Sequence, residues 1–324
     1  MNRRAFLSIG SMSLLAGQAV PALASSRKRL PANVMNGADP ALSAFLENDH
    51  LRIGINLDSG GAIFYFSRRD PERNLLNYHD TGRFIQQSYY GDKDGSRWCG
   101  HPWRWNPIQG GGCNGERARV LDSRITSAEM YVKTEPKLWA TGADVPQASM
   151  EEWISLHGET AHIHFKFTYH GTKNNEATTQ ELPAIFADYQ LSNLVCYAGA
   201  KPWTNAQLTR VEPGWPNKYV NANENWAAFV DEHDWGLGVY FPGTSTITTY
   251  RYRPTRNLTT GPQGNACSYL APTRRLVIVP GFTCEYDIEL MIGRVSEIRR
   301  TFYKLHSSRF PEHTANQQYV QRQL

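Results

Sequence analysis

The alternation of apolar and polar side chains in the segment AHIHFKFTYHG constrains the fold more than any other feature of this chain. Apolar residues occupy every second position from Ile163 to Tyr169, and polar residues occupy the alternate positions from His162 to Thr168. A period of two places successive side chains on opposite faces of a β-strand, so this pattern predicts a strand with one buried face. More than ten short runs in the chain are predicted strands, separated by turn signals.

Two further patterns complete the predicted architecture. The segment LRIGINLDSGGAIFYFS predicts a β-hairpin, because alternating apolar residues from Leu51 to Leu57 are followed by a turn at Asp58–Gly61 and a returning strand. Only Arg294–His306 has helical spacing, with its apolar residues on one stripe. We therefore predict an all-β protein, a large antiparallel β-sandwich with a short C-terminal helix.

The beginning of the chain has the features of an export signal. Arg3 and Arg4 precede an apolar run to about Val20 and the small-residue site Ala22–Ala24, a pattern typical of a signal peptide and too short for a membrane anchor. The paired arginines favour the twin-arginine type, whose partner is the twin-arginine translocase, over an ordinary secretory signal. We predict a periplasmic or secreted protein with an export signal at 1–24, a polar connector at 25–37, one sandwich domain at 38–310 and a polar tail at 311–324.

Charge and aromatic content narrow the class of ligand. The chain has 34 Lys and Arg against 30 Asp and Glu, and residues 1–24 hold two of the arginines and no acid, which leaves a net charge of +2. Nucleic-acid binding needs clustered basic residues, so this balance argues against a nucleic-acid partner. Nine Trp and sixteen Tyr are typical of a carbohydrate cleft, where flat rings pack on the C–H faces of sugars. The alternative is that sheet proteins simply favour these residues.

The five cysteines give a weaker prediction. In an oxidising compartment one or two disulfides are expected, and Cys99 and Cys113, which flank a loop rich in Trp and Gly, are the expected pair. Neither a CxxC nor an HExxH spacing occurs, so the sequence predicts no metal site of the usual kinds and no cofactor.

The stretch NYHDTGRFIQQSYYG places many hydrogen-bonding side chains in a predicted strand. Alternation puts Gln86 on one face and Gln87 and Tyr89 on the other, so neither face is cleanly apolar. Buried amides without partners would cost about 1–3 kcal/mol each, and we predict that a wet cleft supplies the partners. The alternative is a strand whose amides bond across the sheet. The predicted substrate-binding residues of this stretch are His79, Arg83, Gln86, Gln87 and Tyr89.

A loop rich in aromatic residues follows this strand. It holds Trp103, Trp105 and Asn106 among glycines, and long loops presented by a rigid sheet are frequent recognition sites. We predict that Trp103 and Trp105 form a platform for a sugar ring, with Asn106 as a polar contact. The alternative is that the tryptophans pack together in a satellite cluster held by the Cys99–Cys113 pair.

Three acidic residues are candidate catalytic groups. Glu181 precedes an apolar pair in TTQELPAIFADYQ, where a low dielectric would raise its pKa and keep it protonated as an acid; the alternative is a solvated surface group. Glu224 precedes Trp226, a further predicted sugar contact, at the entry of a predicted strand. Cleavage of a glycosidic bond needs one protonated and one ionised carboxyl facing each other. We therefore expect Glu181 to be paired with Glu224 or Asp80.

The order of these segments resembles the galactose-mutarotase-like supersandwich, a superfamily of sugar epimerases, polysaccharide lyases and domains of glycoside hydrolases. The segment GGAIFYFSRRDPERNLLNYHD is similar to an early strand of that fold. DTGRFIQQSYYG is similar to the strand that lines the sugar cleft, and FKFTYHGTKNNEATTQELPAIFADYQL to the strands that deliver a cleft residue. Mutarotases usually bring a histidine to this last place, where this chain has Glu181. The resemblance therefore implies binding of sugars and not ring opening. The chain also resembles an uncharacterised family of secreted bacterial proteins.

The sequence favours a carbohydrate-active enzyme, most of all a glycoside hydrolase that uses a carboxylate pair on an oligo- or polysaccharide. One alternative is a polysaccharide lyase, in which Tyr89, Tyr90 or His79 removes a proton beside a uronate carboxylate that Arg83 and Gln87 neutralise. The other alternative is a glycan-binding protein without catalysis, which needs aromatic and amide side chains but no opposed acids.

Overall fold

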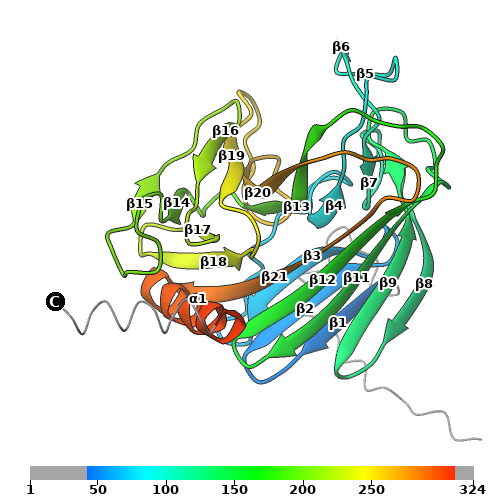
Figure 1. Ribbon diagram of the computed structural model, residues 1–324. Coiled ribbons are helices and arrows are strands. Elements are labelled where there is room, and N and C mark those ends of the chain that lie inside the picture. Colours follow the sequence, from blue (N-terminus) through cyan, green and yellow to red (C-terminus); the bar gives the residue numbers. More distant parts are fainter. Residues whose placement is uncertain (1–41, 311–324) are drawn as a thin grey trace, which may run out of the picture.

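The computed structural model describes residues 42–310 of the chain. The predicted signal peptide, the polar connector and the C-terminal tail lie outside these residues. Two large antiparallel sheets pack face to face, and one helix follows the last strand (Figure 1). The predicted all-β sandwich with a short C-terminal helix is confirmed.

The larger sheet has ten strands, which we call the ten-stranded sheet. Its main path runs in the order β1-β2-β3-β4-β13-β20-β19-β16, and β7 pairs with both β4 and β10. The bounds are β1 Ser43–Glu47, β2 Leu51–Asn56, β3 Ala62–Arg68, β4 Ile85–Ser88, β7 Pro107–Ile108, β10 Lys137–Leu138, β13 Thr178–Asp188, β16 Lys218–Asn221, β19 Thr246–Tyr252 and β20 Cys267–Leu276.

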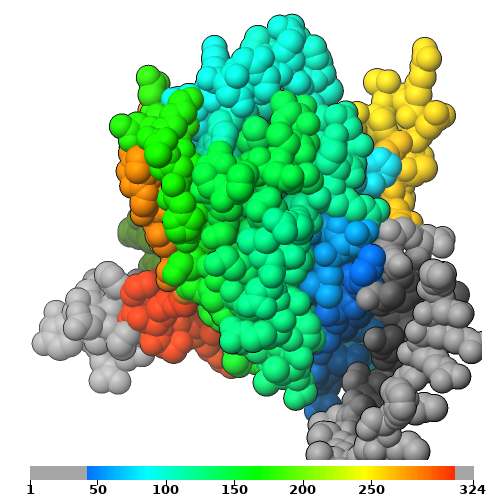
Figure 2. Space-filling model, turned by 90° about the vertical axis from the view of Figure 1, so that its right-hand side faces the viewer, coloured from blue at the N-terminus to red at the C-terminus, as the bar shows by residue number. Residues whose placement is uncertain are grey.

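The second sheet has nine strands in the order β15-β14-β17-β18-β21-β12-β11-β9-β8, and we call it the nine-stranded sheet. Its bounds are β8 Arg119–Ile125, β9 Glu129–Glu135, β11 Ala148–His157, β12 Thr160–Tyr169, β14 Asn193–Cys196, β15 Thr209–Val211, β17 Trp226–Val230, β18 Trp235–Tyr240 and β21 Thr283–Arg294. The short hairpin of β5 and β6 stands at the top of the molecule (Figures 1 and 2), and the remaining bounds are β5 Arg97–Trp98, β6 His101–Pro102 and α1 Val295–Arg309.

Strand β12 shows why alternation predicted the sandwich. Ile163, Phe165 and Phe167 are fully buried, whereas His162 and His164 between them are partly exposed on the outer face. The strand pairs with β11 on one side and β21 on the other along nearly its whole length. Full burial of each large apolar side chain contributes about 1.5–3 kcal/mol, so the buried face holds this strand in register.

The predicted hairpin is also confirmed, as β2 pairs antiparallel with β3. Gly60 and Gly61 in its turn have φ of 59° and 71°, a region that favours glycine. A Cβ atom on Gly60 would lie 1.9 Å from the carbonyl oxygen of Gln109. The turn is therefore packed directly beneath the segment that follows β7.

The main core lies between the two sheets. It joins side chains of the ten-stranded sheet, such as Ile53 and Leu270, to side chains of the nine-stranded sheet, such as Ile154 and Ile288. Helix α1 packs outside this core on β18 and β21 (Figure 1). Within residues 42–310, no helix is both long enough and apolar enough to span a membrane.

The expected disulfide between Cys99 and Cys113 is wrong, because all five cysteines are free thiols in the structure. Cys99 is exposed at the turn of the β5–β6 hairpin. The Sγ of Cys113 instead lies 3.8 Å from the carbonyl oxygen of Ala140. The loop between them is therefore held by hydrogen bonds and ring packing and not by a covalent link.

Candidate functional site

Glu181 is placed on the outer face of the ten-stranded sheet, the face turned away from the core. It pairs with Ser88 of β4, and the register between β4 and β13 then shifts before Ala184 pairs with Gln86. Such a shift is a β-bulge, which re-aims a side chain within a strand. After the bulge, Ile185 belongs to the main core, and Phe186 packs outward. The bulge therefore separates Glu181 from the regular alternation of its strand.

Two tyrosine hydroxyls surround the half-buried carboxyl group of Glu181. Tyr90 donates a hydrogen bond to Oε2 at 2.6 Å, and Tyr269 makes a second one. Burial raises the pKa of Glu181 above its usual value, and the two tyrosine hydrogen bonds offset only part of this effect. The carboxyl group consequently keeps its proton to a higher pH than an exposed glutamate, the behaviour that its sequence context predicts.

A row of aromatic rings extends from Glu181 along the outer face. Tyr269 packs on Phe186 at 4.6 Å and stacks on Tyr250 at 4.5 Å between ring centroids. Tyr250 in turn meets Trp215 at 5.0 Å, and Trp215 is 61% exposed. The sequence analysis missed this row, although the alternation in STITTYRY places Tyr250 and Tyr252 on one face, and Trp215 contacts both rings.

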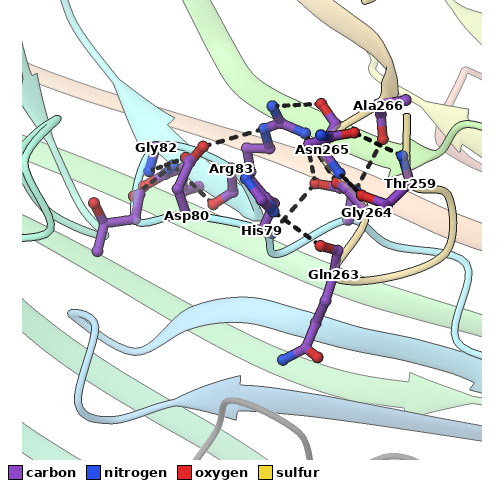
Figure 3. Close-up of polar contacts among 12 residues, drawn as sticks. His79, Asp80, Gly82, Arg83, Thr259, Gln263, Gly264, Asn265 and Ala266 are labelled. Atoms are coloured by element: carbon purple, nitrogen blue, oxygen red, sulfur yellow. Dashed lines mark hydrogen bonds and ion pairs between the residues drawn. The ribbon is translucent and has the colours of Figure 1, made fainter. Parts of the chain in front are cut away.

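The predicted residues Asp80, Arg83 and His79 lie in the segment before β4, next to the loop at 259–266 (Figure 3). The Arg83 guanidinium pairs with Asp80 at 3.3 Å and donates to the carbonyl oxygens of Gly264 and Asn265 at 3.3 and 3.1 Å. His79 Nδ1 lies 2.8 Å from the carbonyl oxygen of Gln263. Arg83 therefore ties two loops together, while Asp80 and His79 remain exposed.

Tyr250 is a buried phenol on which both Glu181 and Asp80 act electrostatically. Burial raises the pKa of Tyr250 well above its usual value, and the negative charges of Glu181 and Asp80 both raise it further. The expected pairing of Glu181 with Asp80 stays a prediction.

The predicted platform of Trp103 and Trp105 is not formed, because the two rings lie in separate clusters. Trp103 packs against Trp98 at 4.8 Å between ring centroids, and Trp98 against Trp139 at 5.7 Å. Trp103 Nε1 donates to Asn106, whose amide reaches Ser88 Oγ at 3.3 Å. This half-buried cluster borders the site through Ser88, the residue paired with Glu181.

Trp105 and Asn106 do not lie in a sugar-binding surface with Trp103, as the sequence predicted. Trp105 packs edge-on against Tyr169 at 5.4 Å, in a cluster between the sheets. Asn106 is fully buried and donates to the carbonyl oxygen of Tyr89 at 2.7 Å. Neither residue offers a free face for a sugar next to Trp103.

Three predicted substrate contacts are fully buried, namely Gln86, Gln87 and Tyr89. Gln86 accepts a hydrogen bond from the amide of Gly110 at 2.7 Å, and Gln87 donates to the carbonyl oxygen of Glu151 at 2.9 Å. Tyr89 stacks on Phe167 with 3.9 Å between ring centroids. Backbone groups are the partners of Gln86 and of the Gln87 amide nitrogen, while Gln87 Oε1 is buried without a hydrogen-bond partner among the described residues. The predicted direct contact with a substrate is therefore wrong for all three residues, because their side chains are buried.

Glu224 lies on a different part of the molecule, beneath helix α1. Its buried carboxylate accepts hydrogen bonds from Trp226 Nε1 and the Trp203 amide, both at 3.0 Å. It also accepts 3.0 Å and 2.6 Å bonds from Arg299 and Tyr303 of the helix. Glu224 and the fully buried Trp226 are consequently joined in an anchor for α1. The expected pairing of Glu224 with Glu181 is not formed.

Among residues 42–310, no group of three or more His, Cys, Asp or Glu side chains is arranged to hold a metal ion.

Comparison with solved structures identifies the fold. A candidate aldose 1-epimerase from Escherichia coli K12 superposes with a TM-score of 0.53 and 11% identity, covering 78% of this chain and 100% of its own. A galactose mutarotase related enzyme from Lactobacillus acidophilus gives a TM-score of 0.50 and 9% identity, covering 77% and 97%. No family model and no curated protein matches the chain in sequence. At these identities the likeness concerns the fold alone.

Proposed function

We propose that this chain, which has the galactose mutarotase-like β-sandwich fold, binds an oligo- or polysaccharide on the outer face of the ten-stranded sheet and hydrolyses a glycosidic bond there. The observation that carries the proposal is the environment of Glu181. Its carboxyl group has a raised pKa, two tyrosine partners and a continuous row of aromatic rings beside it. Sugar-binding sites combine such flat rings with a few polar groups.

In this proposal Glu181 is the general acid. Its neutral carboxyl donates a proton to the leaving oxygen of the glycosidic bond, and Tyr90 and Tyr269 hold the carboxyl group in place. Asp80, which is paired with Arg83 and exposed, supplies the negative carboxylate. This carboxylate either removes a proton from the water that attacks the anomeric carbon, or bonds to that carbon itself until water displaces it. Trp215 and Tyr250 give the sugar chain an aromatic surface on which to pack.

The tyrosines favour hydrolysis over β-elimination. A lyase needs a base that removes a proton beside a uronate carboxylate. Burial raises the pKa of both Tyr90 and Tyr269 well above the usual value, and the adjacent Glu181 raises it further, so both phenols are poor bases at neutral pH. Tyr89 is stacked inside the sandwich and does not reach the outer face. Of the predicted bases, only His79 remains exposed.

The test is an assay of the purified protein against bacterial, plant and algal glycans, read for new reducing ends and for ultraviolet absorbance of unsaturated products. We expect reducing ends without absorbance. Glu181→Gln should lower kcat by roughly 10²–10⁴-fold, the usual contribution of a general acid, while binding persists. Glu176→Gln, an exposed acid in the preceding loop, is the matched control and should keep full activity.

Each alternative has its own result in this assay. Full activity of Glu181→Gln would refute the assigned acid. Products that absorb ultraviolet light would show that the enzyme is a lyase. Binding of a glycan without any product would show that the protein binds glycans without catalysis.

We also propose that the protein works outside the cytoplasm as a periplasmic or secreted protein. The support is the pattern of residues 1–24, with Arg3 and Arg4 before an apolar run. A reporter fused to this segment should be exported, and Arg3→Lys with Arg4→Lys should block its export. Export that survives this double change would point to an ordinary secretory signal.

A further inference from the structure

A second cavity lies far from Glu181, beside the start of helix α1. It has a volume of about 430 Å³, which is in the range of about 300–1,000 Å³ typical of small-molecule sites. Three segments form it, namely the loop that enters β15, the turn between β17 and β18, and the first turns of α1. The charged and polar side chains that line it are Asn205, Arg210, Asp234, Arg294, Ser296, Arg299, Arg300 and Tyr303.

Two of the four arginines have carboxylate partners. Arg210 forms a two-pronged pair with Asp234, and one prong measures 2.8 Å between Nη2 and Oδ2. Arg299 pairs with the buried Glu224 at 3.0 Å. These pairs fix two guanidinium groups in the wall of the cavity, and the charge of each is balanced.

The other two arginines, Arg294 and Arg300, are not balanced in this way. Both are exposed, and within residues 42–310 neither forms an ion pair. Arg294 donates to the carbonyl oxygen of His233 at 3.3 Å. Glu297 on the same helical turn directs its carboxylate to the Arg294 backbone amide and does not line the cavity. The cavity thus has an excess of positive charge with nothing in its lining to neutralise it.

Arg299, which lines the cavity, has one buried donor without an acceptor. The Nε–H group of Arg299 is buried and has no hydrogen-bond partner within the described chain. The rest of this guanidinium is held by the carbonyl oxygen of Ala206 at 2.7 Å and by Tyr303 at 3.0 Å. The side chain is consequently fixed before any ligand arrives, which lowers the entropy cost of binding.

We propose that this cavity binds the carboxylate of an acidic sugar, such as a uronate unit. Guanidinium groups recognise carboxylates through paired, charge-assisted hydrogen bonds. The volume exceeds the need of a bare oxyanion, and the apolar surfaces of Leu208 and Val295 give the ring of a sugar something to contact. The inference is independent of Glu181, which belongs to another face of the molecule.

Calorimetric titration of the purified protein with glucuronate, glucose and inorganic phosphate tests this site. Glucuronate should bind more tightly than glucose, and its affinity should fall as salt is added, because exposed charges are screened. The double change Arg294→Ala with Arg300→Ala should weaken glucuronate binding by about tenfold or more and leave glucose binding unchanged. Arg256→Ala removes an exposed arginine from a distant loop and should change nothing.

Three results of these titrations would overturn the proposal. Equal affinities for glucuronate and glucose, or a double variant that keeps the wild-type affinity, would refute a carboxylate site. Binding of phosphate without glucuronate would refute an acidic sugar as the ligand. Glu181→Gln should retain glucuronate binding, so a failure of the proposed hydrolysis leaves this test intact. If the double variant unfolds at a lower temperature, Arg300→Glu alone should give the same loss, because this side chain is exposed.

Discussion

Glu181 and Glu224 lie in two regions of the sandwich that differ in the groups that surround the carboxyl group. Glu181 is half-buried, and its contacts are the neutral hydroxyls of Tyr90 and Tyr269. Glu224 is fully buried, and its contacts include the guanidinium of Arg299. Both residues stand beside an apolar stretch of sequence and differ mainly in whether a cation faces them.

The difference shows that the hydrogen-bonding partners of a buried carboxyl group determine whether it suits proton transfer or structural anchoring. Neutral donors offset only part of the cost of burying a charge, so the carboxyl of Glu181 keeps a raised pKa and remains suited to proton transfer. A guanidinium partner with further hydrogen bonds holds a buried carboxylate as an ion pair, which suits structural anchoring. The helix α1 supplies this partner for Glu224, whereas within residues 42–310 no helix packs on the strand of Glu181.

The largest effect is expected from a variant that removes the Arg299 guanidinium. Arg299→Met should lower the free energy of unfolding by about 3–5 kcal/mol, because it leaves the buried charge of Glu224 unpaired. Urea unfolding measures the change. Arg300→Met, on the exposed side of the same helix, should stay within about 0.5 kcal/mol of the wild type. A loss below about 1 kcal/mol for Arg299→Met would mean that the pair does not anchor the helix.

Glu152 extends the comparison to an acid with no hydrogen-bond partner. It is fully buried between the sheets, and burial raises its pKa from 4.5 to about 8, while the nearby Gln109 lowers it slightly. The folded protein therefore binds a proton that the unfolded chain has lost, so stability should fall from about pH 4.5 to about pH 8.

The slope should reach about 1.4 kcal/mol per pH unit in this window, and Glu152→Gln should remove it. Unfolding curves recorded at several pH values between these limits measure the slope. Glu151→Gln, the partly exposed neighbour, serves as the control. Equal slopes for the wild type and Glu152→Gln would contradict the assigned protonation.

Tyr90→Phe probes the neutral partners of Glu181. It removes the 2.6 Å hydrogen bond and should cost about 1 kcal/mol of stability. Since this bond lowers the pKa of Glu181, its loss should raise that pKa further. If Glu181 acts as the acid, activity is present below its pKa and lost as the pH rises through it, so the alkaline limb of the rate profile should move to higher pH. If the alkaline limb stays at the same pH, the hydrogen bond from Tyr90 does not influence the pKa of the catalytic acid.

Trp215→Ala probes the end of the aromatic row and should have the smallest effect on the fold. The side chain is 61% exposed, so the free energy of unfolding should change by less than about 0.5 kcal/mol. Binding of an oligosaccharide should weaken by about 0.5–1.5 kcal/mol, because a packing surface for one sugar ring is lost. Tyr219→Ala, also 61% exposed, shows whether the row continues onto β16. Unchanged affinity in both variants would confine the site to the surroundings of Glu181.

Local patterns predicted the strands well and the roles of the polar residues poorly. The alternation in β12 and the glycine turn between β2 and β3 depend on neighbouring residues alone, and both predictions are confirmed. Gln86 and Gln87 have the same residue type as cleft amides, yet they bond to backbone groups that lie 24 and 64 positions away. Sequence alternation assigns a face to a side chain but does not tell what covers that face.

The sequence by itself therefore determined the secondary structure, the sandwich class and the burial-prone setting of Glu181, because each follows from the periodicity and polarity of adjacent residues. Only the tertiary structure decided that Tyr90 and Tyr269 contact Glu181, whereas Glu224 pairs with Arg299. Such pairings join segments separated by many residues, and they follow from the order in which strands assemble into sheets and from the elements that cover each face.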